Sequence, residues 1–327
     1  YVSTFEDRQI VAANPAVLEL YGYSETEFLR LHSGDLLFEP SARERERLLN
    51  ATAPQRRIQG LVRRHRTASG QALDVEIWTD EIDFEGRNAR LVLIYDVTER
   101  RRAERELARV SRAQRMLSAC NDALVRSTSE PDVLARICQI ALNIGGYRRA
   151  YVGLACDDEA RSIRIADWPG QPDDHLLQLR LSWDSAHPQG NGPMARVIRS
   201  GEPLVFEDIA QHREELQMAD ATLAQGVRNL VMLPLRAGGR TFGVLNLMGS
   251  EVQAVGPSEL FLLLEMADNL AYGIGHQRAM AQRRQDLERI EQLAYSDALT
   301  GLPNRARLLE RLQRALEQAS ATGQWGA

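Results

Sequence analysis

The residue types best suited to chemistry lie near the end of the sequence, in the stretch Tyr295–Arg305. It joins two helical patterns, because Thr300-Gly301 interrupts the first and Pro303 suits the first turn of the second. Apolar side chains recur at helical spacing after it, at Leu308, Leu309, Leu312, Ala315 and Leu316. Neither this joint nor the rest of the chain carries a Ser/His/Asp, metal-ligand or phosphate-loop constellation, so we do not expect an enzyme.

The same stretch resembles a known motif. Asp297-x-Leu-Thr-Gly-Leu-Pro-Asn-Arg305 is similar to the opening of GGDEF domains, the diguanylate cyclases that make cyclic di-GMP from GTP. The catalytic Gly-Gly-(Asp/Glu)-Glu-Phe turn of that family is absent, because Gly145-Gly146 precedes Tyr and Gly238-Gly239 precedes Arg. The resemblance implies that residues 297–327 begin a GGDEF domain. It also implies that residues 1–327 are the sensory part of a diguanylate cyclase, with or without a phosphodiesterase domain, and do not turn over GTP themselves.

Composition limits the class of protein. The 327 residues suit two or three domains, and 44% hydrophobic with 26% charged residues is ordinary globular composition. A net charge of −5 argues against a nucleic-acid-binding protein. No apolar run reaches the roughly 18–20 residues that span a bilayer. We therefore expect a cytoplasmic protein, while segments upstream of Tyr1 stay open. Three cysteines without a CxxC spacing indicate reduced, partly buried thiols: Cys120, Cys138 and Cys156.

Residues 1–98 predict a first α+β domain, with two strands, small helices and then three strands. Asn14-Pro15 and Ser24-x-x-Glu27 are helix-start signals. This order of elements, with Asp96-x-Thr98 at its end, resembles a PAS domain. The resemblance implies a small-molecule pocket against the sheet and a signalling helix that starts at Asp96 and Thr98. The alternative for these two residues is that they only cap the helix.

Strand alternation assigns the faces of the expected sheet in this domain. It places Leu73, Val75 and Ile77 in one apolar row, with Val75 and Ile77 as candidate ligand contacts, and Trp78 on the opposite face. His32 and His65 are expected at the surface, so no haem ligand is indicated, and the segment has no cysteine for a flavin. The cofactor is therefore unknown, and an empty or lipid-like pocket is as good an expectation as any named group.

Residues 99–118 predict a linker helix with alternating charges. Its apolar residues have heptad spacing, and Gln114 and Asn121 fall at intervening core positions. The pattern favours a coiled-coil seam in a parallel homodimer. The alternative is a helix that packs on its own domain. The apolar seam positions are Ala103, Leu107, Val110, Leu117 and Leu124.

Residues 119–275 predict a second domain with a central sheet and a long closing helix. Gly192-Pro193 through Gly201, Phe206–Ile209 and Leu233–Leu247 resemble a GAF domain. The resemblance implies ligand binding over the open face of the sheet, although packing in the core or a loop is the alternative for each candidate. Cyclic nucleotides and bilins are disfavoured, because their characteristic motifs are missing. The candidate pocket residues are Trp168, Trp183, Asp184, Met194 and Met232.

Residues 276–296 predict a second signalling helix that leads to Asp297. Leu287 and Ile290 lie on its heptad seam, which Arg283 weakens. The fold class expected overall is α+β, with two antiparallel-sheet sensor domains joined and followed by long helices. The leading function is a dimeric sensor for a small molecule that regulates a cyclase. A ligand-free dimerisation scaffold and a sensor for another signalling output are the alternatives.

Overall fold

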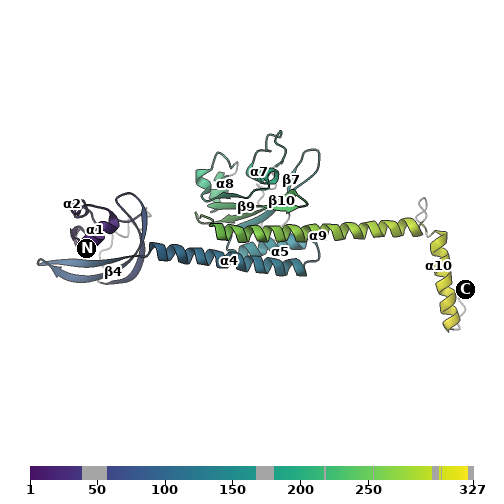
Figure 1. The fold of residues 1–327 in the computed structure, drawn as a ribbon, viewed down its shortest axis with the longest axis horizontal. Helices are drawn as coiled ribbons and strands as arrows, with labels where there is room; N and C mark the ends of the chain where they lie inside the picture. The colour runs from purple at the N-terminus through teal and green to yellow at the C-terminus, as the bar shows by residue number, and fades with distance from the viewer. Residues whose placement is uncertain are drawn as a thin grey trace. The chain divides into compact units, whose positions relative to one another are not determined.

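The computed structural model describes residues 1–38, 57–166, 180–216, 219–252, 254–296, 302 and 304–322. The chain divides into two compact units, Tyr1–Ala108 and Arg109–Ala327. Each unit contains one five-stranded antiparallel sheet (Figure 1). The α+β class expected from the sequence, with two antiparallel sheets and long helices, is confirmed.

The sheet of the first unit has the strand order β2-β1-β5-β4-β3. Its two short helices begin as the sequence predicts, since Asn14 caps α1 and Ser24 forms a capping box with Glu27. A further small helix is expected from the sequence within residues 41–49, and this segment lies outside the described residues. The elements are β1 (Val2–Thr4), β2 (Ile10–Ala12), α1 (Pro15–Tyr21), α2 (Glu25–Phe28), β3 (Ile58–Arg66), β4 (Ala72–Phe84) and β5 (Arg87–Asp96).

The core of the first unit lies between the sheet and its short helices. Leu73 and Val75 are buried there and Ile77 is partly buried, so the alternation along β4 predicted the inward row. Trp78 is 38% exposed and belongs to the other row. The side chains that fill this core include several aromatic rings in mutual contact: Tyr1, Tyr21, Tyr23 and Phe28.

The expectation that His65 lies at the surface is wrong. Its side chain is buried, and the Tyr21 hydroxyl lies 2.6 Å from its Nδ1 atom. Burial is the main cause that lowers the pKa of His65 to about 4. A neutral imidazole whose Nδ1 accepts a hydrogen bond from the Tyr21 hydroxyl fits this setting, because a buried polar atom needs a partner.

The sheet of the second unit has the order β7-β6-β10-β9-β8. Its strands are β6 (Arg149–Ala155), β7 (Ile163–Ile165), β8 (Leu204–Phe206), β9 (Asn229–Ala237) and β10 (Arg240–Gly249). The Gly238-Gly239 turn, with both glycines at positive φ, joins β9 to β10 as predicted. The helices are α4 (Thr98–Arg126), which starts in the first unit, α5 (Glu130–Asn143), α7 (Pro193–Ser200), η1 (Ile209–Gln211), α8 (Ala219–Ala224), α9 (Pro257–Tyr295) and α10 (Arg305–Thr322).

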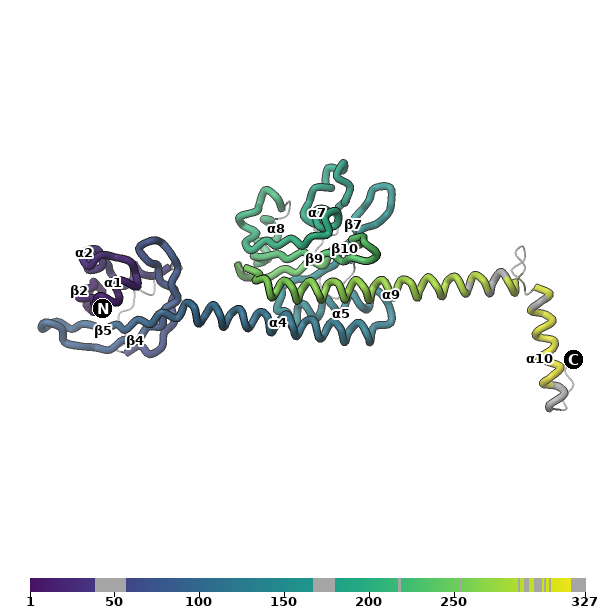
Figure 2. Tube along the Cα trace, in the orientation of Figure 1, coloured from purple at the N-terminus to yellow at the C-terminus, as the bar shows by residue number. Residues whose placement is uncertain are grey.

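Helices cover both faces of this second sheet. The part of α4 from Arg109 onward lies with α5 and α9 against one face, and α7 and α8 lie over the other (Figure 1). Although far apart in sequence, α4 and α9 run side by side (Figure 2), where the Asn269 side chain donates to that of Asn121. Alternate residues of each strand therefore enter two separate cores.

Candidate functional site: an apolar cavity over the second sheet

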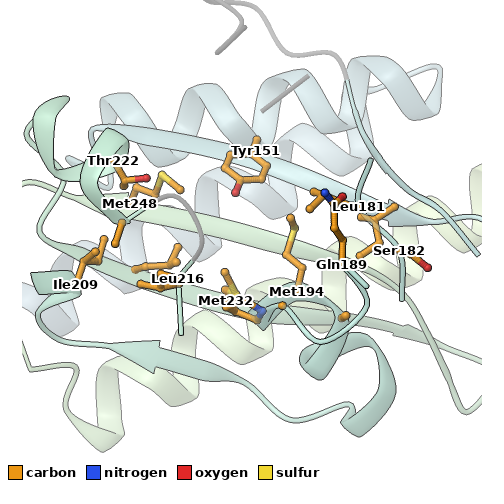
Figure 3. Close-up of a pocket in the computed structure, with 16 residues that line it drawn as sticks. Tyr151, Leu181, Ser182, Gln189, Met194, Ile209, Leu216, Thr222, Met232 and Met248 are labelled. Carbon is orange, nitrogen blue, oxygen red and sulfur yellow. The ribbon is translucent and has the colours of Figure 1, made fainter. Parts of the chain in front are cut away.

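The second unit contains a cavity on the sheet face that α7 and α8 cover. Its volume is about 90 Å³. Strands β6, β9 and β10 form its floor, and the segments around residues 181–195, 209–216 and 219–222 form its walls (Figure 3). The lining residues are Tyr151, Ile163, Leu181, Ser182, Gln189, Gly192, Pro193, Met194, Ala195, Ile209, Leu216, Ala219, Thr222, Leu230, Met232 and Met248.

Local sequence explains how the floor and one wall arise. Leu230 and Met232 on β9 point to the side of the sheet with the cavity, whereas Val231 and Leu233 point to the side that α4, α5 and α9 cover. Pro193 begins α7 directly after Gly192. This start brings Met194 over Gly153 of β6, where an added Cβ would lie only 3.0 Å from the Met194 sulfur. A glycine at position 153 therefore leaves the space that Met194 occupies.

The walls carry no charged side chain among the described residues that line the cavity. Four lining side chains are polar: Tyr151, Ser182, Gln189 and Thr222. The Ser182 hydroxyl is already engaged, because it donates to the carbonyl of Ala160 at 2.9 Å and accepts from the Asp184 amide. The cavity therefore suits an uncharged ligand, since an ion would lose its hydration without gaining a counter-charge.

One polar residue of the sheet lies on the cavity side but is fully buried. Asn246 of β10 is 0% exposed, and its register partners on both neighbouring strands, Tyr151 and Met232, line the cavity. Its Nδ2 donates to the Val244 carbonyl at 3.1 Å and lies 3.6 Å from the Met194 sulfur. Sequence analysis missed Asn246, although a lone amide between the apolar residues Val244 and Met248 of one strand face was a visible signal.

The structure brings together two of the predicted pocket residues. Met194 and Met232 both line the cavity. Trp183 and Asp184 follow the lining residue Ser182 but serve the loop: the Trp183 indole donates to the Cys156 carbonyl at 3.0 Å, and Asp184 accepts from the Ala186 amide. Trp168 lies outside the described residues. A role in ligand binding stays a prediction for all five.

In the first unit, Val75 is fully buried and Ile77 is half-buried among aromatic neighbours. Their role as ligand contacts stays a prediction.

Asp96 and Thr98 lie at the start of α4, where the Asp96 carboxylate accepts a hydrogen bond from the Thr98 amide at 2.8 Å. The Thr98 hydroxyl accepts from the Asp74 amide at 3.0 Å and so fastens the start of α4 to β4.

In the part of α4 that belongs to the second unit, the positions that were predicted to form a dimer seam pack largely against that unit itself. Beyond Arg109, α4 buries Ala113, Met116, Cys120 and Ala123 in its own domain and half-buries Leu117 and Leu124. Gln114 is exposed, and Asn121 is paired with Asn269. For this part of α4 the structure supports the alternative of a helix packed on its own domain.

The later part of α9 keeps its apolar seam residues in solvent. Leu287 is 59% exposed and Ile290 is 62% exposed. Asp297 lies outside the described residues. The parallel dimer stays a prediction, and these side chains are its best candidates for contact.

Nowhere in the part of the chain that the structure describes do three or more His, Cys, Asp or Glu side chains gather in a way that could hold a metal ion. Within the same residues, no helix combines the length and apolar character needed to cross a membrane.

Each unit contains a segment that matches the model of a known family. Residues 1–99 match the family model of the PAS domain, and residues 127–274 match that of the GAF domain. No curated protein matches the chain.

Solved structures similar to this chain include three bacterial proteins. The GAF domain of a phosphoenolpyruvate-protein phosphotransferase from Coxiella burnetii is 17% identical, with a TM-score of 0.44 over 53% of this chain and 98% of that one. The corresponding Acinetobacter domain is 14% identical, with a TM-score of 0.43 over 51% and 94%. Free methionine-R-sulfoxide reductase from Neisseria meningitidis is 17% identical, with a TM-score of 0.41 over 51% and 91%.

Proposed function

We propose that this chain, which carries a PAS domain followed by a GAF domain, is the sensory region of a dimeric cyclic di-GMP signalling protein. The GAF cavity binds a small molecule, and α4 and α9 transmit the change to a diguanylate cyclase, with or without a phosphodiesterase domain. Residues 1–327 do not turn over GTP in this proposal. The GGDEF-like motif from Asp297 to Arg305 is the reason for naming this output.

The observation that carries the sensor role is the position of the cavity on a two-faced sheet. On β10, Val244 and Met248 face the side of the sheet with the cavity, while Leu245 and Leu247 pack in the core that α4, α5 and α9 cover. That second core contains Met116 and Cys120 of α4 and Met266 and Leu270 of α9. A ligand that shifts β10 therefore acts directly on the residues that hold both long helices, because close-packed cores transmit displacement.

The transmission step needs an element with two packings of similar energy. The exposed seam on α9, with Leu287 and Ile290 but also Arg283, gives a weak dimer contact. A ligand with different affinity for the two packings shifts their populations by that difference.

A cavity-filling substitution tests the sensor role in the intact protein. Thr222 on α8 lines the cavity, whereas Asp220 on the same helix has a side chain that is 85% exposed. We expect Thr222→Trp to change cyclic di-GMP production several-fold and Asp220→Trp to leave it unchanged. Equal output from both variants, with both folded, favours the ligand-free scaffold.

Two further tests address the dimer and the output. In a Cys156→Ser background, Leu287→Cys and Ile290→Cys should each form a disulfide-linked dimer, while Gln285→Cys, off the seam, should not. No crosslink at either seam position, with and without ligand, would count against helix transmission.

A Gly-Gly-(Asp/Glu)-Glu-Phe turn in the coding sequence after residue 327 is expected, and a histidine-kinase His box there would instead favour another output.

A further inference from the structure

The amide of Asn246 has one atom that the protein leaves unmatched. Its orientation is fixed, because Nδ2 faces the Val244 carbonyl and a carbonyl requires a donor. The Oδ1 atom is buried and accepts no hydrogen bond from the described residues. An unmatched buried acceptor destabilises a fold unless a bound molecule supplies the missing donor.

The position of Asn246 connects this acceptor to the cavity. Directly opposite residues of an antiparallel sheet point to the same face, so Asn246 lies between Tyr151 and Met232 on the cavity side. Met194 lies above it, 3.6 Å from Nδ2. Met194 also lines the cavity, and it is a flexible, unbranched side chain, so it is the contact of Asn246 that can move to admit a bound molecule.

A second unmatched acceptor lies in the cavity wall. The Oε1 atom of Gln189 is buried and has no hydrogen-bond donor among the described residues. Gln189 comes from the loop before α7, whereas Asn246 comes from the sheet (Figure 3 shows Gln189 beside the cavity). Both unmatched atoms are acceptors, so they favour a ligand that supplies donors.

The remaining lining restricts the rest of the ligand. Most of its surface is aliphatic or thioether, and none of the described lining side chains is charged. A ligand carrying a formal charge would be desolvated without compensation. An uncharged molecule with an apolar body pays no such penalty and gains from burial.

From these observations we infer that the GAF cavity selects a small, uncharged, mainly apolar molecule with an N–H or O–H group, which donates a hydrogen bond to Asn246 Oδ1 once Met194 moves aside. The inference rests on the proposed function only in taking this cavity as the ligand site. It names the chemical class of the signal.

Phenol and toluene are suitable probes, because they have the same number of non-hydrogen atoms and only phenol donates a hydrogen bond. Titrations of the whole chain, labelled with ¹³C at the methionine methyls, should shift the signals of Met194, Met232 and Met248. Since a neutral hydrogen bond contributes modestly, we expect phenol to bind about five- to tenfold more tightly than toluene.

Two variants test the assignment to Asn246. Asn246→Leu should remove the preference for phenol while toluene still binds, and Met194→Ala should increase phenol affinity without an equal gain for toluene. Met248→Leu, which changes the lining away from the Asn246 amide, should keep the preference. Unfolding curves show whether each variant is folded. If Asn246→Leu does not fold, the inference is tested by Met194→Ala, whose selective gain in phenol affinity is then the deciding result.

Several outcomes would overturn the inference. They are equal affinity for the two probes in the unmodified chain, a phenol preference that survives Asn246→Leu, and no shift of the three methionine signals with either probe. Failure of the proposed function is distinct from these. In that case the phenol preference would depend on Asn246 as expected, but Thr222→Trp would leave cyclic di-GMP production unchanged.

Discussion

The Arg105 guanidinium lies 2.9 Å from the carboxylate of Asp74, whose side chain is only 9% exposed. Arg105 belongs to the second turn of α4, and Asp74 belongs to the sheet face that alternation predicts to be polar. Arg100 lies 3.5 Å from Glu76 on the same strand face. The first turns of α4 are thus held to β4 by two ion pairs in addition to the Thr98 hydroxyl.

Removing Arg105 should destabilise the PAS domain. Among the described residues, Arg105→Ala leaves the largely buried Asp74 carboxylate with one cationic neighbour, Arg64 at 4.0 Å, so we expect a loss of about 1–2 kcal/mol in unfolding free energy. Arg102→Ala is the matched control, because its pair with Glu99 is exposed, and such pairs contribute roughly 0–0.5 kcal/mol. Urea unfolding of the whole chain measures both, and equal losses would contradict the role given to Asp74.

Acidification should weaken the PAS domain through His65. Its pKa is lowered to about 4 in the folded state, mainly by burial, against about 6.5 in an unfolded chain. Between these values the unfolded state binds a proton that the native state does not, so stability is kept above pH 6.5 and lost as the pH falls toward 4. The loss approaches about 3 kcal/mol over that range.

An NMR titration of the histidine Cε1–H signals checks this prediction. The His65 signal, identified by its loss in His65→Gln, should stay at its neutral position down to about pH 5. The same variant should flatten the fall of the urea midpoint with decreasing pH. A His65 signal that titrates near 6.5 would be inconsistent with the buried, neutral ring.

The two buried asparagines of the GAF domain should lose different amounts of stability on the same substitution. Asn229 accepts from the Gly249 amide at 2.9 Å and donates to the Glu251 carbonyl at 2.8 Å. Asn229→Leu should therefore cost about 2–4 kcal/mol, because it leaves two backbone groups unmatched. Asn246→Leu takes away one hydrogen bond, from Nδ2 to the Val244 carbonyl, but it also removes a buried acceptor that has no partner in the described structure, so its effect should stay within about 1 kcal/mol. Urea unfolding compares the two, and a cost for Asn246→Leu as large as for Asn229→Leu would show that its amide is structurally satisfied.

The cysteines should differ in reactivity. Burial raises the pKa of the Cys120 and Cys138 thiols to about 12. Because the thiolate is the nucleophile, iodoacetamide at pH 8 should modify only the half-buried Cys156 in the native chain. Mass spectrometry after alkylation with and without urea gives the result, and rapid native labelling of Cys120 would reveal opening of the core between α4 and α5.

Local interactions explain what the sequence determined by itself. The caps at Asn14 and Ser24 and the Gly238-Gly239 turn depend on residues within four positions of one another, so their types were sufficient. The inward row of Leu73, Val75 and Ile77 followed from the period of a strand. The order of such elements was specific enough to indicate both domain families.

Which polar groups are buried depends on contacts between distant parts of the chain. The polar side of β4 lies under the start of α4, His65 lies against Tyr21, and Asn246 lies under Met194, and each contact joins residues at least 31 positions apart or from separate elements. The side of α4 that faces its own domain was likewise set by α5 and α9 rather than by heptad spacing, since a helix with several apolar positions can pack in more than one way. Burial of a polar atom is a property of what covers it, and that covering is supplied by distant parts of the chain.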